Sequence, residues 1–193
     1  MSDFTSVNKF SSMPFIPYNI ISYLAKDDRA NGLFKLLKYS TYEALDMPDL
    51  TLSEKLQMIY KNQPNQNDFS IFLHRLVENE ELVERTILKV YKHNTKPEDS
   101  QRAVVCYEFD VLVGAKTPLV KYQNIPCSRK DVVEMFLLNC LNGADVNAVG
   151  WLKFDARLSR YCQSAMGIGN NTTYDGTGIV MAVQVVDLDD KRC

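Results

Sequence analysis

Glu108 and Asp110 are the residues whose type and spacing come nearest to catalytic chemistry. They lie two residues apart in AVVCYEFDVLVG, so one face of a strand carries both carboxylates, about 7 Å apart. Such a pair can act as general acid and general base. A solvated strand face also carries such charges, paired with bases such as Lys89, Lys153 and Arg157. No further site groups accompany the pair, which favours a structural role and no enzyme activity.

The cysteines and histidines indicate neither a nucleophile nor a metal site. The five cysteines include no CxxC pair, and no histidine and cysteine have the spacing of metal ligands. His74 lies in an apolar segment, and His93 ends a predicted strand. We therefore expect no catalytic residue, no metal and no cofactor. We also expect all five cysteines to be reduced, in a cytosol-like compartment.

The glycine-rich segment 163–178, QSAMGIGNNTTYDGTG, does not have the sequence of a phosphate-binding loop. Its glycines lead into the apolar segment IVMAVQVV, which is typical of a strand, and no Gly-Lys-Ser/Thr sequence is present. A phosphate loop instead places its glycines before a helix. We expect a long connection between strands that becomes ordered against a partner, with Ile168 and Tyr174 in the contact.

Composition excludes several classes of protein. The chain has 193 residues, of which 46% are hydrophobic, enough for one domain with a core. Its 22 basic and 24 acidic residues give a net charge of −2, which argues against a protein that wraps nucleic acid. No apolar run approaches the roughly 18–20 residues of a membrane helix. Residues 1–10 are polar, so we expect no secretory signal.

The periodicity predicts an α+β fold: N-terminal helices, then strand–strand–helix–strand–strand in a largely antiparallel sheet with helices on one face. Thr51 and Glu54 form a capping box at the start of a helix whose buried stripe includes Leu52 and Ile59. Ser128 caps another helix. The expected helices cover 20–39 (with a weak point at 31–32), 51–60 and 128–141, and the expected strands cover 86–93, 103–114, 151–161 and 178–188.

Alternation within 103–114 assigns its residues to two faces of the sheet. One face is apolar and faces the core, and it contains Val105, Tyr107, Phe109, Val111 and Val113. The other face is mixed and partly solvated, and it contains Cys106, Glu108, Asp110 and Leu112.

The first 18 residues are expected to form an extended arm, because Pro14 and Pro17 disfavour a helix. The arm carries Phe4, Phe10 and Phe15, whereas disordered segments are poor in aromatic residues. We therefore expect these three residues to contact a neighbouring subunit. Residues 19–188 then form a single domain, and 189–193 a frayed tail.

Several phrases, in order, resemble the head–tail connector proteins of tailed bacteriophages. The helical phrase is ANGLFKLLKYSTYEALDMPDLTLSEKLQMI, and the later phrases are VVCYEFDVLVG, RKDVVEMFLLNCLNG, VGWLKFDARLS and GIVMAVQVVDL. The resemblance covers about residues 30–188. The N-terminal arm and the loop 163–178 look longer than is usual in that family.

The resemblance implies a structural virion protein, similar to tail terminators and head-completion proteins. Such proteins form rings, here a hexamer or dodecamer, that join the portal and head to the tail around the DNA channel. The implied partners are copies of itself and other neck, portal or tail proteins, with packaged DNA as a non-specific neighbour and no membrane. The implied location is the neck of the virion, and the host cytoplasm during assembly.

Two other classes remain open on the residues themselves. One is a small cytosolic enzyme that uses Glu108 and Asp110, or a Cys–His pair. The other is a monomeric peptide-binding module that pairs a partner strand with an exposed sheet edge.

Overall fold

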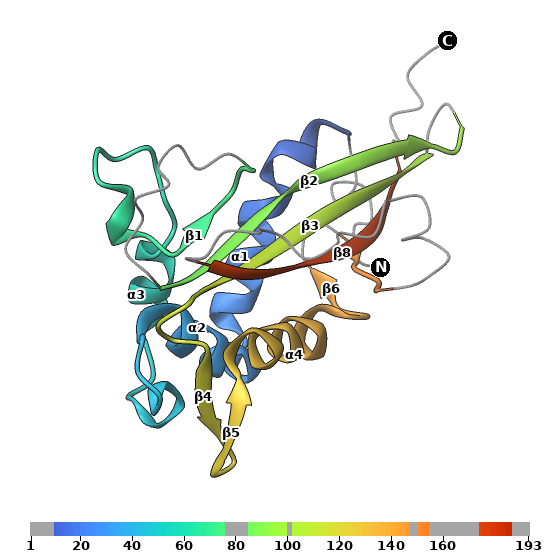
Figure 1. Ribbon diagram of the computed structural model, residues 1–193. Coiled ribbons are helices and arrows are strands. Elements are labelled where there is room, and N and C mark those ends of the chain that lie inside the picture. Colours follow the sequence, from blue (N-terminus) through green and yellow to red (C-terminus); the bar gives the residue numbers. More distant parts are fainter. Residues whose placement is uncertain (1–9, 76–84, 100–101, 147–149, 155–173, 187–193) are drawn as a thin grey trace.

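The computed structural model describes residues 10–75, 85–99, 102–146, 150–154 and 174–186 (Figure 1). The 3₁₀-helices are η2 (Phe10–Phe15), η3 (Asp28–Ala30), η4 (Ala44–Asp46) and η5 (Gln66–Asp68). The α-helices are α1 (Ile16–Lys26), α2 (Asn31–Lys38), α3 (Leu52–Gln57) and α4 (Arg129–Leu141). The strands are β1 (Ile71–Phe72), β2 (Thr86–Pro97), β3 (Arg102–Gly114), β4 (Leu119–Tyr122), β5 (Ile125–Ser128), β6 (Asp145–Val146), β7 (Gly150–Trp151) and β8 (Tyr174–Val186).

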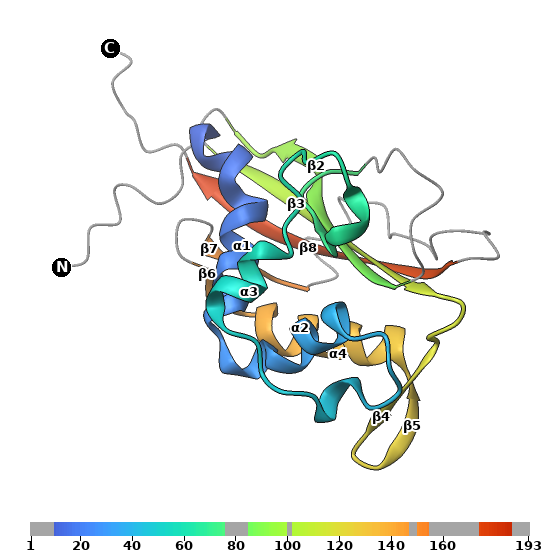
Figure 2. The ribbon, with the colours of Figure 1, turned by 90° about the vertical axis from the view of Figure 1, so that its left-hand side faces the viewer.

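A four-stranded sheet in the order β1-β2-β3-β8 forms one layer of the fold. The long strands β2, β3 and β8 pair antiparallel, whereas the short β1 pairs parallel with β2. Helices α1, α2 and α4 gather on one side of this sheet (Figure 2). The α+β prediction, with N-terminal helices and a largely antiparallel sheet, is confirmed.

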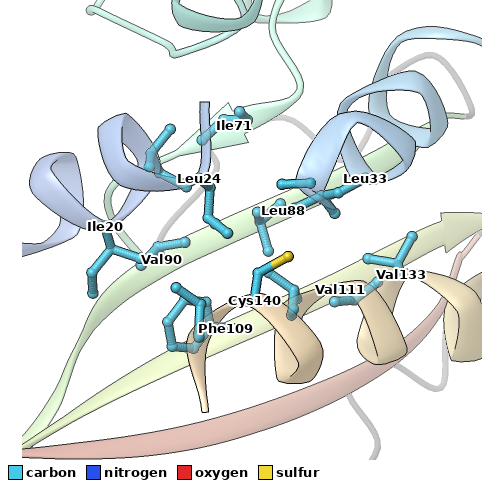
Figure 3. Packing of buried hydrophobic residues seen from close by; sticks show 14 of the residues in the cluster. Ile20, Leu24, Leu33, Ile71, Leu88, Val90, Phe109, Val111, Val133 and Cys140 are labelled. Carbon is cyan, nitrogen blue, oxygen red and sulfur yellow. The ribbon is translucent and has the colours of Figure 1, made fainter. Parts of the chain in front are cut away.

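The core lies between this sheet and the helices. Phe109 and Val111 of β3 face the core, and α4 contributes Val133 and Cys140 (Figure 3). All five residues predicted for the apolar face of β3 belong to this cluster. The alternation therefore assigned the core face of the central strand correctly.

The helical half departs from the prediction at its start. Residues 10–15 form η2 and α1 begins at Ile16, so the expected arm does not reach residue 18, and the helix expected from residue 20 begins earlier. Pro17 lies in the first turn of α1, where a missing amide hydrogen breaks no helical hydrogen bond. The helices separate at Asp27, whose carboxylate accepts a hydrogen bond from the Arg29 amide, and not at residues 31–32.

Two predicted helix caps are confirmed. The Thr51 side chain accepts from the Glu54 amide, and the Glu54 carboxylate accepts from the Thr51 amide. Ser128 accepts from the Asp131 amide at the start of α4. Gly143, with φ of +75°, follows the end of α4. The predicted stripe of α3 is wrong at Leu52, which is exposed.

The strand boundaries differ more than the helix boundaries. β2 extends to Pro97, beyond the end expected at residue 93. β8 begins at Tyr174 and takes up the end of the predicted glycine-rich loop. In place of the strand expected over 151–161, β7 is two residues long, and residues 155–161 lie outside the described residues.

A projecting hairpin, β4–β5, was missed by the sequence patterns. Its turn residues Gln123 and Asn124 have φ of 51° and 64°. Arg129, fully buried at its base, donates hydrogen bonds to the carbonyls of Thr117 and Tyr39, at 3.0 and 2.9 Å. These bonds tie the start of α4 to the chain before the hairpin and to the end of α2.

Candidate functional site

The structure places Glu108 and Asp110 in a buried polar cluster on the sheet face opposite the helices. Their exposed fractions are 7% and 3%, so the prediction of a partly solvated face is wrong for both. In the β2–β3 ladder, Tyr91 lies opposite Glu108 and Lys89 lies opposite Asp110. The neighbours of these carboxylates on β8 are Val180 and Gly178, which carry no charge.

The two carboxylates have different hydrogen-bond partners. The Tyr91 hydroxyl donates to Asp110 Oδ2 at 2.9 Å, and His93 Nδ1 lies 2.6 Å from Glu108 Oε2. His93 reaches Glu108 because the β2–β3 register shifts between Lys92 and Asn94. Asp110 Oδ1 is buried without a hydrogen-bond partner among the described residues.

Burial is the main cause of the perturbed titration in this cluster. The pKa of Asp110 rises from 3.8 to about 6, mainly through burial; the Tyr91 hydrogen bond opposes this rise, and the Glu108 carboxylate adds to it. Burial and the bond to Asp110 raise the pKa of Tyr91, and burial lowers the pKa of Lys89. Protonation of Asp110 would remove one of the two negative charges of the buried carboxylate pair. The cluster can therefore take up a proton near neutral pH.

Of the bases expected near the pair, Lys89 is the one that the structure brings opposite Asp110. The Lys89 ammonium donates to the Arg75 carbonyl at 3.3 Å. Lys153 instead pairs through its backbone with Ala182 on β8, and Arg157 lies outside the described residues. Tyr91 was missed because its place opposite Glu108 depends on the strand register, which one sequence does not provide.

The histidines and cysteines do not combine into a reactive site in the described part of the chain. His74 is exposed and packs edge-on against Tyr60 and Phe72, with ring centroids 5.9 Å apart in each case. No group of three or more histidine, cysteine or acidic residues there could hold a metal ion. No helix there is long and apolar enough to cross a membrane.

The expectation that all five cysteines are reduced is wrong. Cys106 is disulfide-bonded, with a partner outside the described residues, whereas Cys127 and Cys140 are free thiols. Cys106 lies on the same sheet face as the carboxylates, beside Val180 and Ala182. The sequence spacing gave no signal for this bond, because no CxxC pair is present.

The residues predicted to contact a neighbouring subunit are only partly described. Phe15, at the junction of η2 and α1, is 64% exposed, which makes it accessible to a partner. Phe10 begins η2. Tyr174 begins β8 opposite Gly114 and is half-buried. Phe4 and Ile168 lie outside the described residues.

Both edges of the four-stranded sheet carry a backbone contact from elsewhere in the chain. Ile59 forms a parallel bridge with Ile71 of β1, and Lys153 forms an antiparallel bridge with Ala182 of β8. The Lys153 and Ala182 amides each donate to the other's carbonyl, at 2.9 and 3.0 Å. Each bridge covers one position of its edge, so a module that adds a partner strand to an open edge stays a prediction.

Residues 30–183 match the family model named YomW. The chain belongs to the YomW family. The match begins just before α2, so it includes that helix, the hairpin, α4 and most of β8, and leaves out η2 and α1. No curated protein and no solved structure matches this YomW family member.

Proposed function

We propose that this chain is a structural virion protein that forms a homo-oligomeric ring, a hexamer or dodecamer, in the neck of a tailed bacteriophage. The ring joins the portal and head to the tail around the DNA channel. The proposal starts from the phrases that resemble head–tail connector proteins. The structural observation that carries it is the projecting β4–β5 hairpin.

The hairpin is a separate two-stranded sheet that extends away from the four-stranded sheet (Figure 1). Ile125, beside its turn, is 60% exposed, and Leu119 at its base is also exposed. The backbone of β4 is held by a bond from the Lys121 amide to the Tyr42 carbonyl, at 2.8 Å. A supported projection with apolar side chains at its surface is suited to contact another subunit.

Exposed aromatic residues lie at two further places on the surface, outside the hairpin. Phe15 and Tyr18 lie one helical turn apart at the start of α1, and both are exposed. Trp151 and Phe154 are exposed in and after β7. Aromatic side chains are enriched at protein interfaces. Exposed apolar groups at three separate places support contacts on more than one side, as a ring subunit requires.

Light scattering and electron microscopy of the purified full-length protein test the proposal. We expect particles of six or twelve subunits with a central opening, and the protein in purified virions. Replacing Ile125 with Ser should shift the distribution toward smaller species. Leu52→Ser, which alters an exposed leucine on α3, is the matched control and should leave assembly unchanged. A wild-type protein that stays monomeric and is absent from virions would contradict the proposal.

Acid–base catalysis at Glu108 and Asp110 is the second candidate, favoured by the raised pKa of Asp110. The burial of both carboxylates argues against it, because a catalytic group must reach its substrate. The substitution Asp110→Asn separates the two candidates. A structural role predicts that infectivity and assembly survive it, whereas catalysis by this carboxylate predicts that infectivity is lost while assembly is retained.

A further inference from the structure

A pocket of about 330 Å³ lies beside the β4–β5 hairpin, between α2, η4 and α4. Its walls include Leu45 of η4, Tyr122 of the hairpin and Phe136 of α4. At about 30 Å³ for each water molecule, it has room for about ten waters. That space accommodates one large side chain.

The pocket walls suit an aromatic ring. Tyr122 and Phe136 lie edge to face, with centroids 6.4 Å apart and planes at 85°. Leu45 adds an aliphatic wall, and the ammonium groups of Lys35 and Lys121 add cations. An aromatic ring can contact the first two residues edge to face and the ammonium groups through its π face.

The rim of the pocket is polar but charge-balanced. Lys35 pairs with Asp49 at 2.7 Å, and Lys121 pairs with Asp46. Asn124, in the hairpin turn, also lines the pocket and has amide and carbonyl groups to offer. A neutral ring with one N–H donor, such as indole, fits this rim better than an anion, because each lysine already has a carboxylate partner.

Trp151 is the single tryptophan of the chain, and 60% of its surface is exposed. Its backbone is nevertheless tightly held. It lies opposite Asp145 in the β6–β7 ladder, and the next residue, Leu152, is fully buried and donates to the Ala144 carbonyl at 3.0 Å. Lys153 then pairs with Ala182 of β8. The fold thus holds an exposed indole on a fixed support, which lowers the entropy lost on binding.

The hairpin that walls the pocket and the strand that carries Trp151 lie on either side of α4 in the chain. The hairpin leads into the first residue of α4, and β6 and β7 follow its last turn (Figures 1 and 2). The 13 residues of α4 span about 20 Å at 1.5 Å per residue. Trp151 is not among the residues that line the pocket of its own subunit. A site and its ligand at two ends of one molecule form a head-to-tail contact, which closes into a ring when the rotation is suitable.

We propose that the pocket beside the β4–β5 hairpin binds the indole of Trp151 from a neighbouring copy of this chain. The inference rests on the proposed ring and deepens it, because it names the contact that joins successive subunits. Each subunit then donates one indole and accepts one. A buried tryptophan in a pocket at the centre of an interface is a frequent source of binding energy.

Intrinsic fluorescence tests the proposal directly, because all tryptophan emission comes from residue 151. In the wild-type protein we expect the emission to shift to shorter wavelength, and quenching by acrylamide to fall severalfold, as concentration drives assembly. Rings whose emission and quenching equal those of the dilute monomer would overturn the proposal.

Variants at both sides of the contact give a second test. Trp151→Ala should weaken association by about 30-fold or more, the loss typical of an interface hot spot. On the pocket side, Leu45→Phe fills the space and Lys121→Glu replaces a cation with an anion, and each should also weaken association. Two variants are used so that one remains informative if the other misfolds. Leu52→Ala is the control for loss of an exposed apolar side chain and should associate like wild type.

Mixing the two kinds of variant tests the head-to-tail arrangement. Trp151→Ala retains the pocket, and Leu45→Phe retains the indole, so each should fail to assemble alone. Mixed, they should form a one-to-one complex but no closed ring, with emission shifted as in the wild-type ring. If the Trp151→Ala variant assembles as well as the wild type, the indole contact is refuted, but the ring proposal still stands. A wild-type chain that never assembles and is absent from virions would refute the ring itself.

Discussion

The two faces of the four-stranded sheet bury different chemistry. On the helix-covered face, β3 presents an uninterrupted apolar row that shares one core cluster with residues of α1, α2 and α4 (Figure 3). On the opposite face, the same strand buries Glu108 and Asp110 beside the small apolar cluster around Cys106. Alternation along a strand separates the two sets of side chains, but only the tertiary fold decides which face is covered.

Replacing a buried side chain of β3 should therefore change the free energy of unfolding in opposite directions on the two faces. It should fall for Phe109 on the helix-covered face and rise for Asp110 on the other face. Apolar burial stabilises the helix-covered face, whereas the buried carboxylates of the other face lose hydration that their hydrogen bonds only partly replace.

The largest effect is expected on the helix-covered face. Phe109 is fully buried in the core cluster, so Phe109→Ala removes a large apolar side chain and leaves a cavity. We expect the free energy of unfolding to fall by about 3–5 kcal/mol, measured by urea unfolding. A loss below about 1 kcal/mol would mean that this face is not the main source of stability.

A smaller effect of opposite sign is expected for Asp110→Asn on the other face. Because the pKa of Asp110 rises from 3.8 to about 6 on folding, the folded state binds more protons than the unfolded state between these pH values. The stability that Asp110 contributes is thus greatest below pH 3.8 and is lost as the pH rises through about 6. At pH 7.5 we expect the asparagine to stabilise the protein by at most about 3 kcal/mol.

The measurement for Asp110→Asn compares unfolding of wild type and variant at pH 5 and pH 7.5. The difference between the proteins should grow with pH, because only the wild type has a carboxylate at position 110. Asp145→Asn, which changes an exposed aspartate on β6, is the control and should follow the wild type at both values. A variant less stable than wild type at pH 7.5 would show that the charged form of Asp110 is the stabilising one.

The smallest effect is expected for Tyr91→Phe, which removes the 2.9 Å hydrogen bond to Asp110 Oδ2. We expect a loss of about 1 kcal/mol at pH 7.5, typical of one hydrogen bond. Because this bond opposes the rise in the pKa of Asp110, its removal should raise that pKa further. NMR titration of the Asp110 side chain would detect the shift, and an unchanged or lower pKa would count against the hydrogen bond.

Local signals explain which parts of the fold the sequence predicted. The cap at Ser128 and the capping box of Thr51 with Glu54 depend on residues a few positions apart. The core face of β3 followed from simple alternation. Such features need no knowledge of distant contacts.

The β4–β5 hairpin had weaker signals. Its turn places Gln123 and Asn124 at positive φ without the Asn-Gly pair that usually marks such a turn, and Pro126 argues against a strand. The start of α1 was missed for a related reason, since Pro17 is compatible with a first turn as well as with an arm. The candidate sites depended on register and on packing between distant segments, so Glu108 and Asp110 were identified but Tyr91 was not.

The contact between Gly32 and Phe136 links the helix layer to the pocket. A Cβ atom at Gly32 would lie 2.2 Å from Phe136 Cζ, and both residues line the pocket. A larger residue at position 32 therefore has to displace the ring. Among relatives, we expect these two positions to change together, with a bulkier residue at one accompanied by a smaller one at the other.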